Sequence, residues 1–92
     1  MTVAELLEKP ENWCRKYYAE DANGIRTKPE NQSAVRWCVI GAIRKCYFGQ
    51  TQQIEAETKL TKVTGTWNLS LWNDCLSTTH QKMLEAVKEA GI

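Results

Sequence analysis

The sequence predicts an α+β fold in which a short N-terminal helix and a β-hairpin precede three helices packed on a small sheet. Two observations support this prediction. Apolar residues recur at three- and four-residue intervals in the second half of the chain, and an aromatic-rich segment with turn residues precedes them. A chain of 92 residues has room for one domain only, so we assign residues 1–92 to a single domain.

The N-terminal segments predict the helix and the hairpin. The sequence T-V-A-E at residues 2–5 has capping-box spacing, so a short helix begins here and ends at Lys9-Pro10. Residues 13–19 are aromatic-rich and favour an extended strand. The sequence D-A-N-G at residues 21–24 supplies a turn, and residues 25–28 can return as the second strand of a hairpin.

Three helices are predicted in the remainder of the chain. The central one runs from Ala34 to about Tyr47, because apolar residues follow one face of a helix through this segment. Another follows Thr51 and stops at Gly65, and the last begins at the T-T-H-Q capping box of residues 78–81. Between them, the alternating pattern of residues 67–75 favours a short strand.

The charge balance excludes two classes of protein. Twelve basic residues face eleven acidic ones, a formal net charge of +1. A strongly basic nucleic-acid binder and an acidic imitation of DNA would both depart far from this value. Locally, residues 31–50 carry three basic residues and no acidic one, and a helical projection places Arg44 near Trp37 on the polar face.

Basic and aromatic residues are interleaved in the predicted hairpin. This combination suits a phosphate backbone with stacked bases, and it also suits a protein interface. The alternative is that the bases only solvate a hairpin whose tyrosines pack inward. We predict a partner-binding surface made of Arg15, Lys16, Tyr17, Arg26, Lys28, Arg36, Trp37, Arg44 and Lys45.

The four cysteines predict neither a metal site nor a disulfide framework. Cys14, Cys38, Cys46 and Cys75 include no C-x-x-C pair, and no signal segment opens the chain. We therefore expect small buried thiols in a reducing cytoplasm. No apolar stretch is long enough to span a bilayer, so no membrane partner is expected.

Catalysis is a weaker hypothesis than binding. A cysteine together with His80 and Asp74 would have the composition of a cysteine hydrolase. No nucleophile elbow, oxyanion-hole motif or Gly-rich loop accompanies these residues, and a helix N-terminus disfavours a protonated His80. We predict no enzymatic activity, no cofactor and no small-molecule substrate. The hydrolase remains as an alternative.

Two short motifs resemble a known group of proteins. W-C-V-I-G-A at residues 37–42 and W-N-D at residues 72–74, with the upstream Trp13 and H-Q-K-M-L at residues 80–84, resemble a family of small bacterial and phage proteins marked only as a domain of unknown function. The resemblance covers residues 13–90. It implies no reaction and no site residues.

The chain also resembles small phage-encoded anti-CRISPR proteins of the type I-F class. That resemblance implies a stoichiometric inhibitor in the cytoplasm of a bacterial host. It would dock on the Cas proteins of a type I-F surveillance complex, with its basic residues against the guide RNA backbone or an acidic protein surface, and block target DNA hybridisation. A net charge of +1 disfavours DNA mimicry as the mechanism. A phage regulatory protein that binds nucleic acid is a further alternative.

Overall fold

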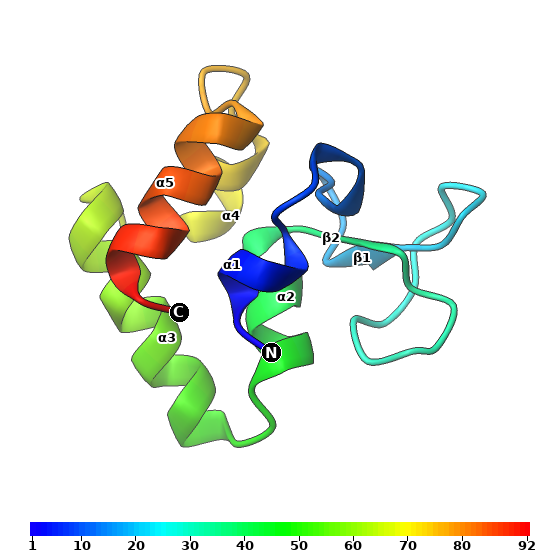
Figure 1. Cartoon of the computed structure of the whole chain (residues 1–92), viewed down its shortest axis with the longest axis horizontal. Coiled ribbons are helices and arrows are strands. Elements are labelled where there is room, and N and C mark those ends of the chain that lie inside the picture. The colour runs from blue at the N-terminus through cyan, green and yellow to red at the C-terminus, as the bar shows by residue number, and fades with distance from the viewer.

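The computed structural model describes all residues 1–92 and arranges helices around one buried helix, with a minimal sheet at one side (Figure 1). The elements in chain order are α1 (Val3–Leu6), the 3-10 helix η1 (Pro10–Asn12), β1 (Ala19–Glu20), β2 (Arg36–Trp37), α2 (Val39–Cys46), α3 (Gln50–Thr64), α4 (Leu69–Asp74) and α5 (His80–Ala90). The predicted α+β class is confirmed. None of the helices has the length and apolar character that crossing a membrane requires.

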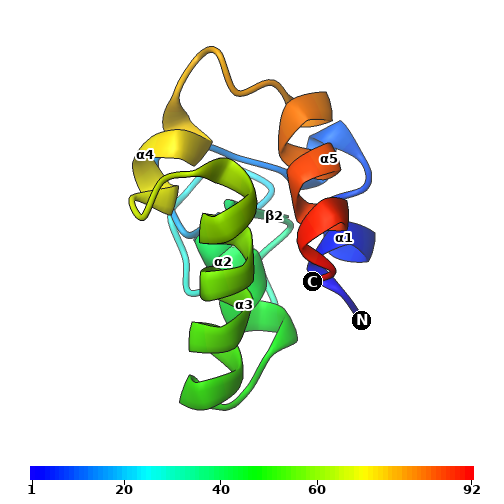
Figure 2. The same cartoon turned by 90° about the vertical axis from the view of Figure 1, so that its left-hand side faces the viewer.

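The core lies where α1, α2, α3 and α5 meet. Figure 2 shows α2 beside α3 and α1 beside α5, and α3 also packs against α5. Ile43, Leu60 and Met83 are fully buried there, and burying a side chain of this size contributes about 1.5–3 kcal/mol. The chain ends meet, since the Val3 amide donates to the Ile92 carbonyl at 2.9 Å. The helices therefore pack mainly on one another rather than on the sheet.

Local signals placed α1 correctly. The Glu5 amide donates to the Thr2 hydroxyl at 3.1 Å, and the Thr2 amide donates to the Glu5 carboxylate at 3.0 Å, which is the predicted capping box. The hydrogen bond that the Thr2 amide donates to the Glu5 carboxylate is the main reason that the pKa of Glu5 is lowered. Pro10 follows, and it opens η1 instead of continuing the helix.

The predicted hairpin forms only in part, and its first strand gains another partner. The chain does turn at residues 21–24, where the Asp21 carboxylate accepts from two backbone amides. The returning segment pairs with the first strand at a single antiparallel bridge between Glu20 and Arg26, where the Thr27 amide donates to the Ala19 carbonyl at 3.0 Å. The strand that pairs with β1 over two residues is β2, which runs antiparallel to it. Two features explain this: Lys16 has φ +79° and bends the first strand, and Pro29 has no amide to donate.

The central helix begins five residues later than predicted. Residues 34–38 are not helical; within them Arg36 and Trp37 form β2, and the Cys38 sulfur caps α2 by accepting from the Gly41 amide at 3.4 Å. A glycine is required at position 41, because an added Cβ would lie 1.7 Å from the Tyr18 carbonyl oxygen. The helical projection that placed Trp37 near Arg44 was therefore wrong.

Residues 67–75 also differ from the prediction. They form α4, capped by Asn68, whose side chain accepts from the Leu71 amide at 3.1 Å, and not a strand. The prediction for α3 is confirmed, with Gly65 in the left-handed conformation at its end. The last helix starts one residue later than the predicted box, because Thr79 is its cap.

Candidate functional site

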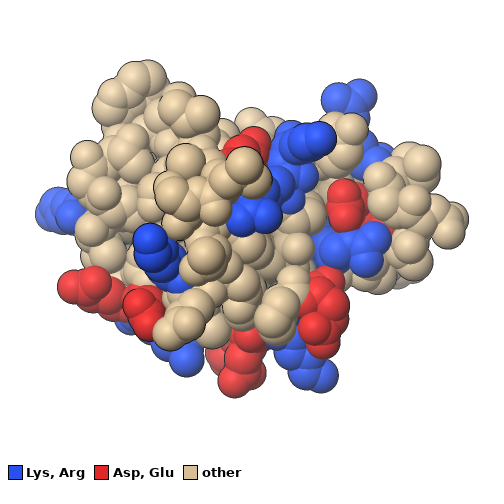
Figure 3. All heavy atoms as spheres, turned by 90° about the horizontal axis from the view of Figure 1, so that it is seen from above, with Lys and Arg blue, Asp and Glu red and all other residues tan.

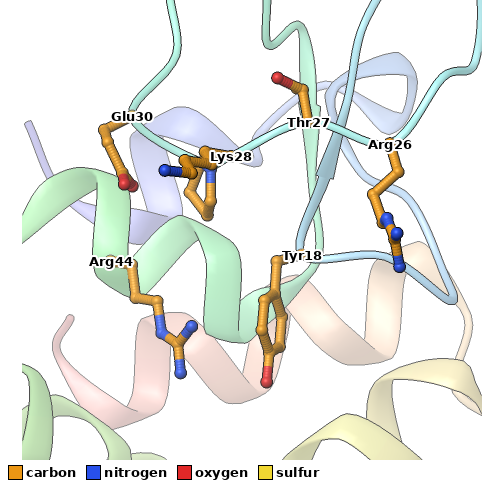
Figure 4. A pocket seen from close by; sticks show the side chains of 7 residues that line it. Tyr18, Arg26, Thr27, Lys28, Glu30 and Arg44 are labelled. Carbon is orange, nitrogen blue, oxygen red and sulfur yellow. The ribbon is translucent and has the colours of Figure 1, made fainter.

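An open pocket of about 470 Å³ lies between the segment that follows β1 and the last turn of α2. In the view of Figure 4 the Tyr18 ring lies between the Arg44 and Arg26 side chains. Three basic residues and one acidic residue contribute to the wall, so the pocket favours an anionic ligand. Its lining consists of Tyr18, Arg26, Thr27, Lys28, Pro29, Glu30 and Arg44.

Arg44 and Tyr18 form a fixed pair at the edge of this pocket. The guanidinium carbon of Arg44 lies 4.3 Å from the centroid of the Tyr18 ring, a cation–π contact worth about 0.5–1 kcal/mol at an exposed site. Tyr18 is 44% exposed, and Arg44 makes no hydrogen bond or ion pair within the protein. The guanidinium is therefore oriented by the ring, while its N–H groups stay free for a ligand.

The segment that carries Arg26 and Lys28 is tied to β2. The Trp37 indole donates to the carbonyl of the buried Pro29 at 2.9 Å. Arg36 bonds the Glu20 carboxylate at 2.6 Å and donates to the Asp21 carbonyl at 2.9 Å. These bonds hold the two pocket bases near α2.

A second hollow, of about 300 Å³, lies on the other side of the same pair. Tyr18 and Arg44 form the wall that both hollows share, and the second one extends across α3 and α4. Trp67 lies on it and is 85% exposed. We name the two hollows and their shared wall the Tyr18–Arg44 surface. Its second half is lined further by Ile40, Glu57, Thr61, Trp67, Asn68, Leu69 and Ser70.

Charge on the molecule is dispersed. On the face drawn in Figure 3, basic and acidic side chains are interspersed among uncharged ones. The one ion pair of the protein joins Arg36 to Glu20, so the pocket bases Arg26, Lys28 and Arg44 have no acidic partner within ion-pair distance. The concentration of charge in residues 31–50 is thus partly neutralised by the Arg36–Glu20 pair, and three of the unpaired cations, Arg26, Lys28 and Arg44, lie at the pocket.

Away from this surface, the W-N-D motif forms a buried junction. Asn73 is fully buried on α4, and its carbonyl oxygen accepts from the Trp13 indole at 2.7 Å and from the Val39 amide at 3.0 Å. Its amide group donates to the Cys14 carbonyl at 3.1 Å and to the Asp74 carboxylate at 3.0 Å. One side chain thereby joins the N-terminal segment, α2 and α4.

The comparison with protein families matches residues 2–91 to a family of unknown function, DUF6197. The chain belongs to this DUF6197 family. Searches of the curated proteins and of the solved structures find no match. The expected membership of a family of unknown function is confirmed. In this chain the W-C-x-x-G-A motif lies at the start of α2, where Cys38 caps the helix, and the W-N-D motif supplies the Asn73 junction.

Of the predicted binding residues in this DUF6197 chain, Arg26, Lys28 and Arg44 come together in one pocket. Arg15 lies elsewhere, with its guanidinium over the Trp13 ring at 4.5 Å and donating to the Thr78 carbonyl at 2.7 Å. Its geometry is that of a structural residue. The remaining side chains that lie outside both hollows are Lys16, Tyr17, Arg36, Trp37 and Lys45.

Two of these residues are committed to the fold. Trp37 is 7% exposed and cannot present its ring to a partner, while Arg36 is occupied by Glu20 and Asp21. Lys16 is exposed and its backbone amide donates to the Asp74 carboxylate at 2.9 Å. Sequence reasoning thus overestimated the surface, because it placed buried and paired groups on a helix face.

Three side chains with a ring or a charge belong to the Tyr18–Arg44 surface and were not among the predicted binding residues. Tyr18, Glu57 and Trp67 come from three distant segments that only the tertiary fold brings to one place. The sequence did contain a signal for Trp67. This residue lies between Gly65, which ends one helix, and Asn68, which caps the next, so it belongs to the apolar face of neither helix. No sequence signal distinguished Glu57 from the other polar residues of its helix.

The residues of the alternative hydrolase are not assembled as a catalytic pair. His80 forms a hydrogen bond of 2.7 Å with the Leu7 carbonyl, and no cysteine sulfur bonds to it. Burial raises the pKa of Cys14 to about 12 and also raises the pKa values of Cys38 and Cys46. Only Cys75 is exposed, and its hydrogen bond with Ser77 lowers its pKa.

Proposed function

We propose that this DUF6197 protein is a non-catalytic binding protein that contacts single-stranded RNA of a ribonucleoprotein through the Tyr18–Arg44 surface. The observation that supports this most is the Arg44 guanidinium held on the Tyr18 ring between two hollows, with Arg26 and Lys28 in the first of them. Unpaired cations suit phosphates, and exposed aromatic rings suit unstacked bases.

The arrangement favours a single strand over a duplex. Bases can reach an aromatic ring only where they are not paired, and Trp67 offers a nearly fully exposed ring beside the cations. Three basic residues neutralise few phosphates, so the expected affinity is modest and the slope of log K against log salt is about −2. A surface of such modest affinity is suited to a protein that also makes contacts with the proteins of the ribonucleoprotein.

A fluorescence polarisation titration with a labelled single-stranded RNA tests the proposal. Arg44→Glu should weaken binding and make the salt slope shallower by about 0.7 for each phosphate that is no longer neutralised. Lys88→Glu is the matched control, because it makes the same charge change in the last turn of a helix, and α5 lines neither hollow. Absence of salt-dependent binding, or equal weakening in both variants, would contradict the proposal.

The finer form of the proposal follows from the sequence resemblance. In it, the protein is a phage-encoded anti-CRISPR inhibitor that acts in the cytoplasm of a bacterial host, docks on Cas proteins and guide RNA of a type I-F surveillance complex, and blocks hybridisation with target DNA. The net charge of +1 and the interspersed charges of Figure 3 favour docking over DNA mimicry.

A pull-down with purified type I-F surveillance complex tests this form. Tagged wild-type protein should co-elute with the complex and reduce its binding of target DNA, and Arg44→Glu should co-elute less than Lys88→Glu. If wild-type protein does not co-elute, the type I-F form is wrong, and the RNA titration still decides the broader proposal.

A further inference from the structure

The second hollow carries polar side chains that have no hydrogen-bond partner within the protein, and they lie beside an exposed ring. Glu57, Thr61 and Ser70 line it, and their side chains make no hydrogen bond within the protein. Glu57 is half-buried and has no basic partner within ion-pair distance. A carboxylate kept without a partner in a hollow is poised to accept hydrogen bonds from a ligand.

Trp67 supplies the second requirement of a base site, a flat apolar face. Its ring is 85% exposed on the same hollow, too far out to contribute to the core. A base stacked on this ring would present its edge to polar groups on α3. The volume of about 300 Å³ is at the small end for ligand pockets, which fits one base.

We propose that the second hollow binds a single guanine base of the RNA, with Trp67 stacking on its ring and Glu57 accepting hydrogen bonds from its Watson–Crick edge. This inference rests on the proposed RNA-binding function and adds base selectivity to it. Guanine is the base whose Watson–Crick edge offers two adjacent donors, N1–H and the N2 amino group, to the two oxygens of a carboxylate.

The shared wall explains how the base would be placed. Arg44 lines both hollows, so a phosphate bound beside Arg26 and Lys28 in the first is followed along the strand by a base at the second. Uracil offers one donor between two carbonyl acceptors, and these would face the Glu57 carboxylate unfavourably. The hollow therefore discriminates by repulsion as well as by attraction.

Competition between RNA oligomers tests the inference. Fluorescence polarisation with oligouridine eight-mers, carrying either no guanine or one central guanine, should show about tenfold tighter binding of the guanine-containing strand. Glu57→Gln should bring that ratio close to one and leave the salt slope unchanged. Glu55→Gln, which removes the same charge from α3 outside this hollow, should keep the ratio.

The outcomes separate the two proposals. Salt-dependent binding with equal affinity for both strands would overturn the guanine site and leave the RNA-binding function standing. A guanine preference that survives Glu57→Gln would overturn the role of Glu57. If neither strand binds, both proposals are wrong. Trp67→Ala should weaken the binding of every strand by about tenfold because it removes the stacking ring, and circular dichroism checks that each variant is folded.

Discussion

Replacing Asn73 by alanine would remove the junction between three parts of the chain. The substitution leaves the Trp13 indole, the Val39 amide and the Cys14 carbonyl without their partner, and all three lie in buried or half-buried surroundings. The Val39 amide belongs to the first turn of α2, where no intrahelical acceptor exists to replace Asn73. Water cannot take over freely, because Asn73 has no exposed surface.

The size of the destabilisation follows from the number of orphaned groups. A buried polar group left without a partner costs about 1–3 kcal/mol, so three groups cost roughly 3–9 kcal/mol in total. A chain of 92 residues is expected near the lower end of the usual range of about 5–15 kcal/mol for the free energy of unfolding. The variant should therefore retain little stability.

Urea unfolding followed by circular dichroism measures this destabilisation. With a urea dependence of about 1–3 kcal/mol per molar, Asn73→Ala should lower the unfolding midpoint by roughly 2 M or leave the protein unfolded in buffer. The matched control is Asn68→Ala on the same helix, which removes one cap hydrogen bond and should cost about 1 kcal/mol. Equal destabilisation in the two variants would refute the junction.

Three further substitutions or labels test the fold. Gly41→Ala should destabilise by about 1–3 kcal/mol or more in the same urea assay, because its Cβ would meet the Tyr18 carbonyl. Iodoacetamide at neutral pH should label the exposed Cys75 first, because its lowered pKa gives more thiolate. The buried Cys14, with its pKa raised to about 12, should react only after unfolding. Peptide mass mapping measures the labelling of each cysteine, and equal rates would contradict the buried position of Cys14. Thr2→Ala should cost about 0.5–2 kcal/mol, because it removes the hydroxyl that caps the Glu5 amide. The stability that comes from the lowered pKa of Glu5 should persist in this variant, because the Thr2 amide that lowers it most is retained, and it should be lost in both proteins as the pH falls through that pKa; urea midpoints at several pH values measure this.

Elements set by neighbouring residues were predictable from the sequence. The capping box of α1 and the glycine at the end of α3 depend on interactions within one or two turns, and both occur as expected. The start of α2 depends on distant parts of the chain. Residues 34–38 carry helical periodicity, but the Cys38 amide donates to the Tyr18 carbonyl and Trp37 pairs with Ala19, so tertiary pairing overrides the local pattern.

Some residues of the candidate site were likewise predictable from the sequence, and others were not. Arg44 was predicted from the local excess of basic residues in positions 31–50, and Arg26 and Lys28 were predicted from the interleaving of basic and aromatic residues around the turn. The contributions of Glu57 and Trp67 were not, because α3 and the α3–α4 connection reach the shared wall only after the helices pack. The prediction for Trp37 failed because burial was not visible in the sequence. Its ring was expected at the surface, whereas its indole donates to the Pro29 carbonyl inside the protein.

The W-C-V-I-G-A and W-N-D motifs contribute side chains that hold the fold together. Cys38 and Gly41 fix the start of α2 against Tyr18, and Asn73 fixes that start against α4. The Tyr18–Arg44 surface takes none of its charged side chains from either motif. The two motifs therefore support the scaffold, whereas the ligand must be inferred from Arg44, Glu57 and their neighbours. Substitutions in the motifs test stability, and substitutions on the surface test binding.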